Sequence, residues 1–239
     1  MRLLSAELLK IWTAPRTVIG MLLAELAIVG LFTAGTIDST SNELQRPGSI
    51  EHDLIGGAST SILFALFIGV LIVTWEYRHG TLTQTFLITP ARERVLSAKL
   101  AVAAFAGAAF AVPALILMLV ITEIWIPDRV DFGGDELKLV GRLLLTGAIV
   151  AVLGLEIGAS TGKQLGAIII VFAWVIFAEP ALSIWHATRE YLPLHAIDGV
   201  LGQGGEDALT FGRGLLTISF YVLALGAVAF ALTRRRDIT

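Results

Sequence analysis

Three glutamates lie inside long apolar stretches of this chain, and their placement is the first sign of chemistry. Glu25, Glu156 and Glu179 each interrupt a run of residues long enough to cross a bilayer. A carboxylate inside a membrane span is costly, so by default it suggests a function. It could form part of a proton relay, a cation site or the lining of a polar substrate path. The alternative is a buried carboxylate hydrogen-bonded to a neighbouring helix, and the different depths of the three argue against one ion site.

Other residue patterns that carry chemistry are weak in this sequence. The chain has no cysteine, which excludes disulfides and cysteine-ligated metals. Its four histidines lack the spacing of a metal-ligand set: His52, His79, His186 and His195. The stretch 158–164 is not a phosphate-binding loop, because only three residues separate its glycines and Gln164 follows Lys163. We therefore expect no catalytic residue, no metal or cofactor site and no nucleotide-binding site on this chain.

A stripe of small residues in the same region has a structural interpretation. Its members recur every three or four residues: Gly147, Ala151, Gly154, Gly158 and Gly162. This spacing places them on one face of a helix. In lipid, small residues let two helix backbones approach closely. We predict that this face packs against a neighbouring helix.

The composition indicates a polytopic membrane protein. Of the 239 residues, 56% are hydrophobic and 15% are charged, whereas soluble domains carry about 25% charged residues. Because lipid tolerates only helices or closed barrels, we predict an all-α integral membrane fold that forms one transmembrane domain over residues 1–239. The predicted spans are about 17–37, 54–75, 100–122, 139–160, 165–185 and 214–233.

The distribution of charge predicts the orientation of these six spans. With both termini inside, the inner segments hold 11 of the 17 Lys and Arg residues and the outer segments hold 6. Acidic residues show the opposite bias. The excess of basic residues on the cytoplasmic side of membrane proteins therefore predicts two cytoplasmic termini. We expect the lipid bilayer as the surroundings and no nucleic-acid partner.

Residues 2–15 predict an amphipathic helix in front of the first span. Leu4, Leu8 and Ile11 follow the i, i+4, i+7 spacing of one helix face, and Pro15 interrupts the helix. This pattern favours an interfacial helix on the cytoplasmic leaflet, with a frayed polar leader as the alternative.

The outer segment 186–213 contains a second candidate element. Its middle, Leu192–Leu201, is apolar enough to dip into the membrane or to cap a cavity. A short re-entrant or interfacial element is the favoured interpretation, and an ordinary outer loop is the alternative.

The polar segment 76–99 between the second and third spans reads EYRHGTLTQTFLITPARERVLSAK. A basic segment at this place is expected in the cytoplasm. Thr81–Ile88 can form a short helix after Gly80, and Thr89-Pro90 supplies a stop. Three arginines offer a docking surface or only anchor the segment on the inner side: Arg78, Arg92 and Arg94.

This segment resembles the cytoplasmic loop of type-2 ABC exporter permeases, the class that includes G-type drug and sterol exporters and O-antigen exporters. Small members show a Glu, a Gly-Thr pair, an apolar turn, a Pro, one or more Arg, and a Lys that opens the third span. The matching residues are Glu76, Gly80-Thr81, Phe86-Leu87-Ile88, Pro90, Arg92, Arg94 and Lys99. The form EYRHGT is similar to that of small permeases from high-GC Gram-positive bacteria. The resemblance covers the whole chain in architecture and residues 76–99 in detail.

The resemblance implies a permease subunit that catalyses no reaction itself and lies in a bacterial plasma membrane. A separate ABC ATP-binding subunit, which holds ATP and Mg, would dock on a cytoplasmic coupling helix between the second and third spans. A second permease copy or a paralogue would complete the translocation path. The implied docking residues are Glu76, Arg78, Gly80, Thr81, Phe86, Pro90, Arg92 and Arg94.

Two other functions stay open at this point. An ion-coupled secondary transporter would use Glu25, Glu156 and Glu179 and would need no ATPase. A membrane anchor or sensor would bind partners without moving a substrate. The apolar spans suit an amphiphilic or hydrophobic cargo, but lipid-facing helices need the same residues, so the sequence does not indicate the cargo.

Overall fold

The structure is a computed structural model that describes residues 2–11, 15–41, 56–81, 85, 87, 91–125, 134–203 and 209–235. Within these residues every regular element is a helix. Among the described residues, six helical segments are long and apolar enough to cross a membrane. The prediction of an all-α membrane protein with six spans is therefore confirmed.

The helices follow one another without a strand between them in the described ranges. The spans are α2 (Pro15–Ser41), α4 (Ser61–His79), α6 (Arg92–Trp125), α7 (Gly134–Thr161), the broken helix α8–η1–α9 (Gln164–Ala173, Trp174–Ala178, Glu179–Leu182) and α12 (Phe211–Arg235). The shorter helices are α1 (Arg2–Ile11), α10 (His186–Arg189) and α11 (Pro193–Leu201).

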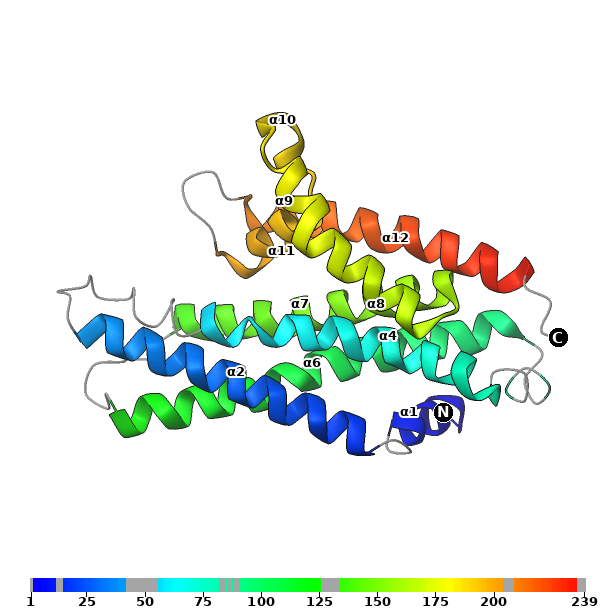
Figure 1. Cartoon of the computed structure of the whole chain (residues 1–239), viewed down its shortest axis with the longest axis horizontal. Helices are drawn as coiled ribbons and strands as arrows, with labels where there is room; N and C mark the ends of the chain where they lie inside the picture. The colour runs from blue at the N-terminus through cyan, green and yellow to red at the C-terminus, as the bar shows by residue number, and fades with distance from the viewer. Residues whose placement is uncertain are drawn as a thin grey trace.

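The spans α2, α4, α6 and α7 lie side by side along the long axis of the molecule, and α8 is inclined to them (Figure 1). Helix α1 and the last turns of α12 lie at the same end of the bundle. At that end the Arg92 guanidinium donates a hydrogen bond of 3.0 Å to the carbonyl oxygen of Thr233. An even number of spans returns the chain to the side on which it began, so both described ends lie together.

Two span boundaries differ from the predicted ones in a way that affects the polar segment. Helix α4 continues to His79 and α6 begins at Arg92, whereas the apolar runs predicted an end at 75 and a start at 100. Both ends of segment 76–99 are therefore helical. Hydropathy detects only the apolar part of a helix, and these helices continue where polar side chains find partners.

Helices α4, α6 and α7 form the centre of the bundle because small residues let their backbones touch. A Cβ atom added to Gly69 would overlap the carbonyl oxygen of Ala151, and one added to Gly154 would overlap that of Leu66. A Cβ on Gly158 would come within 2.7 Å of Val73. The predicted small-residue face on the fourth span is thus confirmed up to residue 158.

Gly162 was predicted to share this face, and that prediction is wrong. Helix α7 ends at Thr161, and Gly162 has a φ of 66° in the turn before α8. This left-handed conformation strains other residues but not glycine. Gly162 therefore allows the tight turn between α7 and α8 and does not contribute to the packing of these helices.

Helix α11 covers the opposite end of the bundle from α1. Its residues Ala196 and Val200 are buried in a cluster with Leu153 of α7 and Ile218 of α12. A Cβ on Gly214 would lie 2.6 Å from the carbonyl oxygen of Ala196. The short element predicted within 192–201 is therefore an ordered helix packed on two spans.

Candidate functional site

Four charged side chains from three helices form an ion cluster at the α1 end of the bundle. Lys10 Nζ lies 2.6 Å from Glu7 Oε1 and 2.7 Å from Glu76 Oε1. Lys99 Nζ lies 2.6 Å from Glu7 Oε2 and 2.7 Å from the same Glu76 oxygen. Two cations thus alternate with two anions, and the cluster (Glu7, Lys10, Glu76 and Lys99) is electrically neutral.

Most of this ion cluster is buried. The side chains of Glu7 and Lys99 are both 2% exposed and that of Glu76 is 7% exposed. Taking a charge out of water is expensive unless its partners are well placed, and here each buried charge has an opposite charge within 2.7 Å. The cluster therefore fixes α1 against the last turn of α4 and the second turn of α6.

Lys10 is the member that stays in contact with solvent. Partial burial lowers the pKa of Lys10, but hydrogen bonds and charge attraction from Glu7 and Glu76 raise it by more, so its pKa lies above the usual 10.5. A raised lysine pKa means that this contribution to stability is present at neutral pH and is lost only as the pH rises through the folded-state value.

The resemblance singled out Glu76 and Lys99, but the sequence analysis missed the roles of Glu7 and Lys10. A signal for Glu7 was present. It lies three residues after Leu4 and four before Ile11, which places it in the apolar stripe of α1. In the structure Glu7 is buried at 3% exposure, whereas Leu4 is 42% exposed. An acid inside an apolar stripe indicates a buried partner.

Three more residues of the predicted docking set lie around the end of α4. Arg78 is exposed and donates a weak hydrogen bond of 3.5 Å to Gln164 Oε1. Gly80 caps α4 with a φ of 65°, and its N–H donates to the carbonyl oxygen of Glu76. Thr81 is exposed beside it. A left-handed cap of this kind ends a helix sharply, so Gly80 sets the direction in which the polar segment leaves α4.

The remaining docking residues fall on α6 or outside the described residues. Arg92 and Arg94 belong to the first turn of α6, where Arg94 is exposed. Phe86 and Pro90 lie outside the described residues. Of the predicted coupling helix, the structure describes residues 81, 85 and 87, each in helical conformation. That coupling helix stays a prediction.

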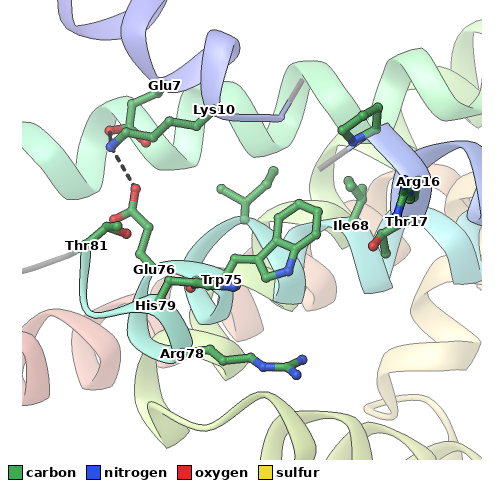
Figure 2. Close-up of a pocket in the computed structure, with 12 residues that line it drawn as sticks. Glu7, Lys10, Arg16, Thr17, Ile68, Trp75, Glu76, Arg78, His79 and Thr81 are labelled. Carbon is green, nitrogen blue, oxygen red and sulfur yellow. Dashed lines mark hydrogen bonds and ion pairs between the residues drawn. The ribbon is translucent and has the colours of Figure 1, made fainter. Parts of the chain in front are cut away.

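A cavity of about 800 Å³ opens beside the ion cluster. It lies between α1, the first turn of α2 and the last three turns of α4, and its lining includes Arg16, Trp75 and Arg78. Figure 2 shows the Trp75 indole in the middle, with the Lys10–Glu76 pair on one side and Arg16 on the other. The cavity is therefore apolar in its centre and charged at its edges.

The three glutamates predicted to lie inside spans are all buried but do not form one site. Glu25 is 0% exposed and Glu156 and Glu179 are 2% exposed. Within the described part of the chain, no hydrogen bond or ion pair joins any two of them, and neither oxygen of Glu25 has a hydrogen-bond partner. A Cβ on Gly226 of α12 would lie 2.8 Å from Glu156, so that carboxylate fills a gap between helices.

Glu179 has a structural role that its contacts define. Its Oε2 accepts a hydrogen bond of 2.5 Å from the Trp174 indole, and its Oε1 accepts one of 2.5 Å from the backbone N–H of Leu194. Leu194 lies in the first turn of α11, where N–H groups lack partners inside the helix. Glu179 therefore connects the π-helical turn of the fifth span to the start of α11.

Replacing Glu179 by alanine is expected to speed hydrogen exchange of the α11 amides about tenfold or more, because it removes hydrogen bonds to a charged group that contribute about 1.5–3 kcal/mol each. Exchange followed by mass spectrometry would measure it. The matched control is Glu190→Ala, which removes an exposed glutamate from the same region. Equal exchange in both variants would contradict the role assigned to Glu179.

Comparison with protein-family models, with curated proteins and with solved structures finds no match to this chain. The site is therefore interpreted from its own geometry. In the ranges that the structure describes, no group of three His, Asp or Glu side chains is placed to hold a metal ion. What the geometry does offer is a buried ion cluster that joins α1 to both ends of the polar segment, and a charged cavity beside it.

Proposed function

We propose that this chain is the permease subunit of an ATP-driven exporter in a bacterial plasma membrane, with ATP and Mg bound by a separate ABC subunit. That subunit docks on segment 76–99 in the cytoplasm, where both termini of the chain also lie. The short helix within 81–88 is the coupling helix, α1 is an interfacial helix, and a second permease copy or a paralogue completes the translocation path.

The observation that carries this proposal is the ion cluster. A docking segment must pass the motion of its partner to the spans, and a flexible connection would lose that motion. Glu76 and Lys99 stand at the two ends of the segment and pair with each other, and α1 contacts both, because Lys10 pairs with Glu76 and Glu7 pairs with Lys99. A displacement of the segment therefore moves α1, α4 and α6 together. The resemblance of the segment to type-2 permeases supports the same function.

The surface of the bundle is compatible with a second permease copy. Helices α2, α8 and α12 expose most of their apolar side chains, whereas α4 and α7 are largely buried within the chain. Lipid covers such faces, and so does another transmembrane subunit.

Replacing Arg94 by glutamine is expected to weaken capture of the ABC subunit about 3- to 10-fold, because an interface charge is lost without any change in the fold. The measurement is affinity purification of the tagged protein from its native membrane in mild detergent, with mass spectrometry of a partner that carries a complete Gly-rich nucleotide-binding loop. The matched control is Arg213→Gln, which removes an exposed arginine from the first turn of α12 at the other end of the bundle.

Deletion of 81–88 in the same experiment is expected to abolish capture while the protein remains inserted. Recovery of the chain without any ATPase, from a preparation in which other membrane complexes stay intact, would contradict the proposal. It would favour an ion-coupled transporter instead, for which Glu25 is the supporting observation because its buried carboxylate lacks a hydrogen-bond partner among the described residues.

A further inference from the structure

Segment 183–191, which joins the fifth span to α11, projects from the bundle. Figure 1 shows α10, which belongs to this segment, farther from the other spans than α9 and α11. The Nε–H group of Arg189 in α10 donates a hydrogen bond of 2.7 Å to Nε2 of His195 in α11. The Tyr221 hydroxyl of α12 donates one of 2.9 Å to the carbonyl oxygen of Tyr191. Side-chain hydrogen bonds thus tie the projecting segment to α11 and α12.

The hydrogen bond between Arg189 and His195 requires a neutral imidazole. An arginine side chain donates hydrogen bonds and accepts none, so Nε2 is the acceptor and the proton of the neutral ring lies on Nδ1. A charged imidazolium carries a proton on both nitrogens. Its Nε2–H group would then face the Arg189 N–H group, and the two positive charges would repel each other. The contact is therefore present while His195 is neutral and is lost when His195 takes up a proton.

Two carboxylates beside His195 attract the charged ring. His195 Nδ1 has no hydrogen-bond partner among the described residues, and it lies 4.0 Å from Oε1 of Glu179 in the fifth span. Asp198, one turn further along α11, also interacts favourably with a positive charge on His195. Protonation of His195 thus strengthens its attraction to Glu179 and Asp198 and breaks its hydrogen bond to Arg189.

Titratable groups on the two spans that pack against α11 are engaged elsewhere. They are the Arg142 guanidinium of α7, which lies over the Phe211 ring, the Tyr221 hydroxyl, which donates to the Tyr191 carbonyl, and the exposed Arg213 of α12. Arg189 is therefore the cation whose contact depends directly on the charge of His195.

From this geometry we propose that the Arg189–His195 contact is a pH-sensitive latch, which holds α10 on α11 while His195 is neutral and releases α10 when His195 is protonated. Histidine side chains change their charge between pH 5 and 8, so the release is expected in that range. In the orientation proposed above, this end of the bundle lies outside the cell, where the surroundings set the pH. The latch involves no ATPase, so it can be tested separately from the exporter proposal.

The latch lies next to an irregular part of the fifth span. Glu179, which faces His195, also accepts the indole N–H of Trp174 in the π-helical turn. Single π-helical turns inside α-helices often mark functional sites. The charge on His195 therefore changes next to the place where the fifth span departs from regular helix geometry.

A spin label on α10 tests the latch, because the chain has no cysteine that would take up a second label. Ala187→Cys introduces a single thiol at an exposed position of α10. A nitroxide attached there reports the motion of α10 in the full-length protein in detergent micelles. Losing a hydrogen bond to a charged group shifts an equilibrium about tenfold or more, so the ratio of mobile to immobile label is expected to rise about tenfold from pH 8 to pH 5. The matched control is Ala181→Cys, at an exposed position of α9, where no change is expected.

Three variants assign the pH dependence to the two residues of the latch. His195→Gln supplies an amide oxygen that still accepts from Arg189 and does not titrate, so the label at position 187 is expected to stay immobile at both pH values. Arg189→Ala removes the donor, so the label is expected to be mobile at both. His79→Gln changes an exposed histidine at the α1 end of the bundle and is expected to keep the pH dependence of the parent.

Any of three results would contradict the proposal. Equal mobility of the label at position 187 at both pH values would show that acid does not release α10. A pH dependence that persists in His195→Gln would assign the titration to another group, such as Asp198. An equal change at position 181 would show that acid loosens the end of the fifth span as a whole and does not act on the latch.

Discussion

Replacing Lys99 by methionine is expected to lower the free energy of unfolding by about 3–5 kcal/mol, because one partner of a buried ion pair is lost while the others stay buried. Lys99 is 2% exposed and contacts both carboxylates of the ion cluster. Without it, Glu7 and Glu76 share a single cation, Lys10, while both carboxylates stay buried. Methionine has nearly the same length as lysine, so the loss is one of charge and not of volume.

Thermal unfolding in detergent micelles measures this effect, with Arg94→Gln as the control because Arg94 is an exposed cation of the same helix. Adding Glu76→Gln to Lys99→Met restores a neutral cluster of Glu7 and Lys10. The double variant is expected to be more stable than Lys99→Met alone, and measuring Glu76→Gln alone as well gives the coupling energy between the two sites. If the two substitutions were simply additive, the cluster would not act as one unit.

The six spans could be predicted because continuous apolar runs and charge asymmetry are local properties of the sequence. The ends of those spans could not be predicted in the same way. Residues 76–79 and 92–99 are rich in charged side chains, and hydropathy assigns them to a loop. They are helical in the structure because Glu76 and Lys99 find partners on α1. That stabilisation comes from a segment far away in the sequence, so no local pattern contains it.

The candidate site was predicted in part, for a similar reason. Glu76 was singled out through a resemblance, and the structure adds what it contacts. Lys99 and Glu7 are separated by 92 positions along the chain, so their pairing depends on how α1 lies against α6. The intramembrane glutamates were expected to lie inside spans, but the separate environments of Glu156 and Glu179 follow from the packing of α7 against α12 and of α11 against the fifth span.

The close approach of α4 and α7 shows where a simple pattern is sufficient. Glycines and alanines at intervals of three or four residues predicted a contact between backbones, and Gly69 of α4 faces Ala151 of α7 at that contact. Gly154 of α7 faces Leu66 of α4 in the same way. The close contact between the two helices therefore requires that Gly69 and Gly154 have no Cβ atom. Replacing glycine by alanine, which adds a single methyl group, tests this requirement.

Replacing Gly69 by alanine is expected to destabilise the protein by about 1–3 kcal/mol or more, because the new methyl group would overlap the Ala151 carbonyl oxygen and force the two backbones apart. The matched control is Gly20→Ala in α2, where an added Cβ meets nothing within 4 Å. Alanine is the better helix former by about 1 kcal/mol, so the control is expected to be as stable as the parent or slightly more stable. Thermal unfolding in the same micelles compares the two. If Gly69→Ala is less stable than the parent and Gly20→Ala is not, the destabilisation arises at the α4–α7 contact. Equal stability of both variants would contradict this, because it would show that the contact tolerates a methyl group.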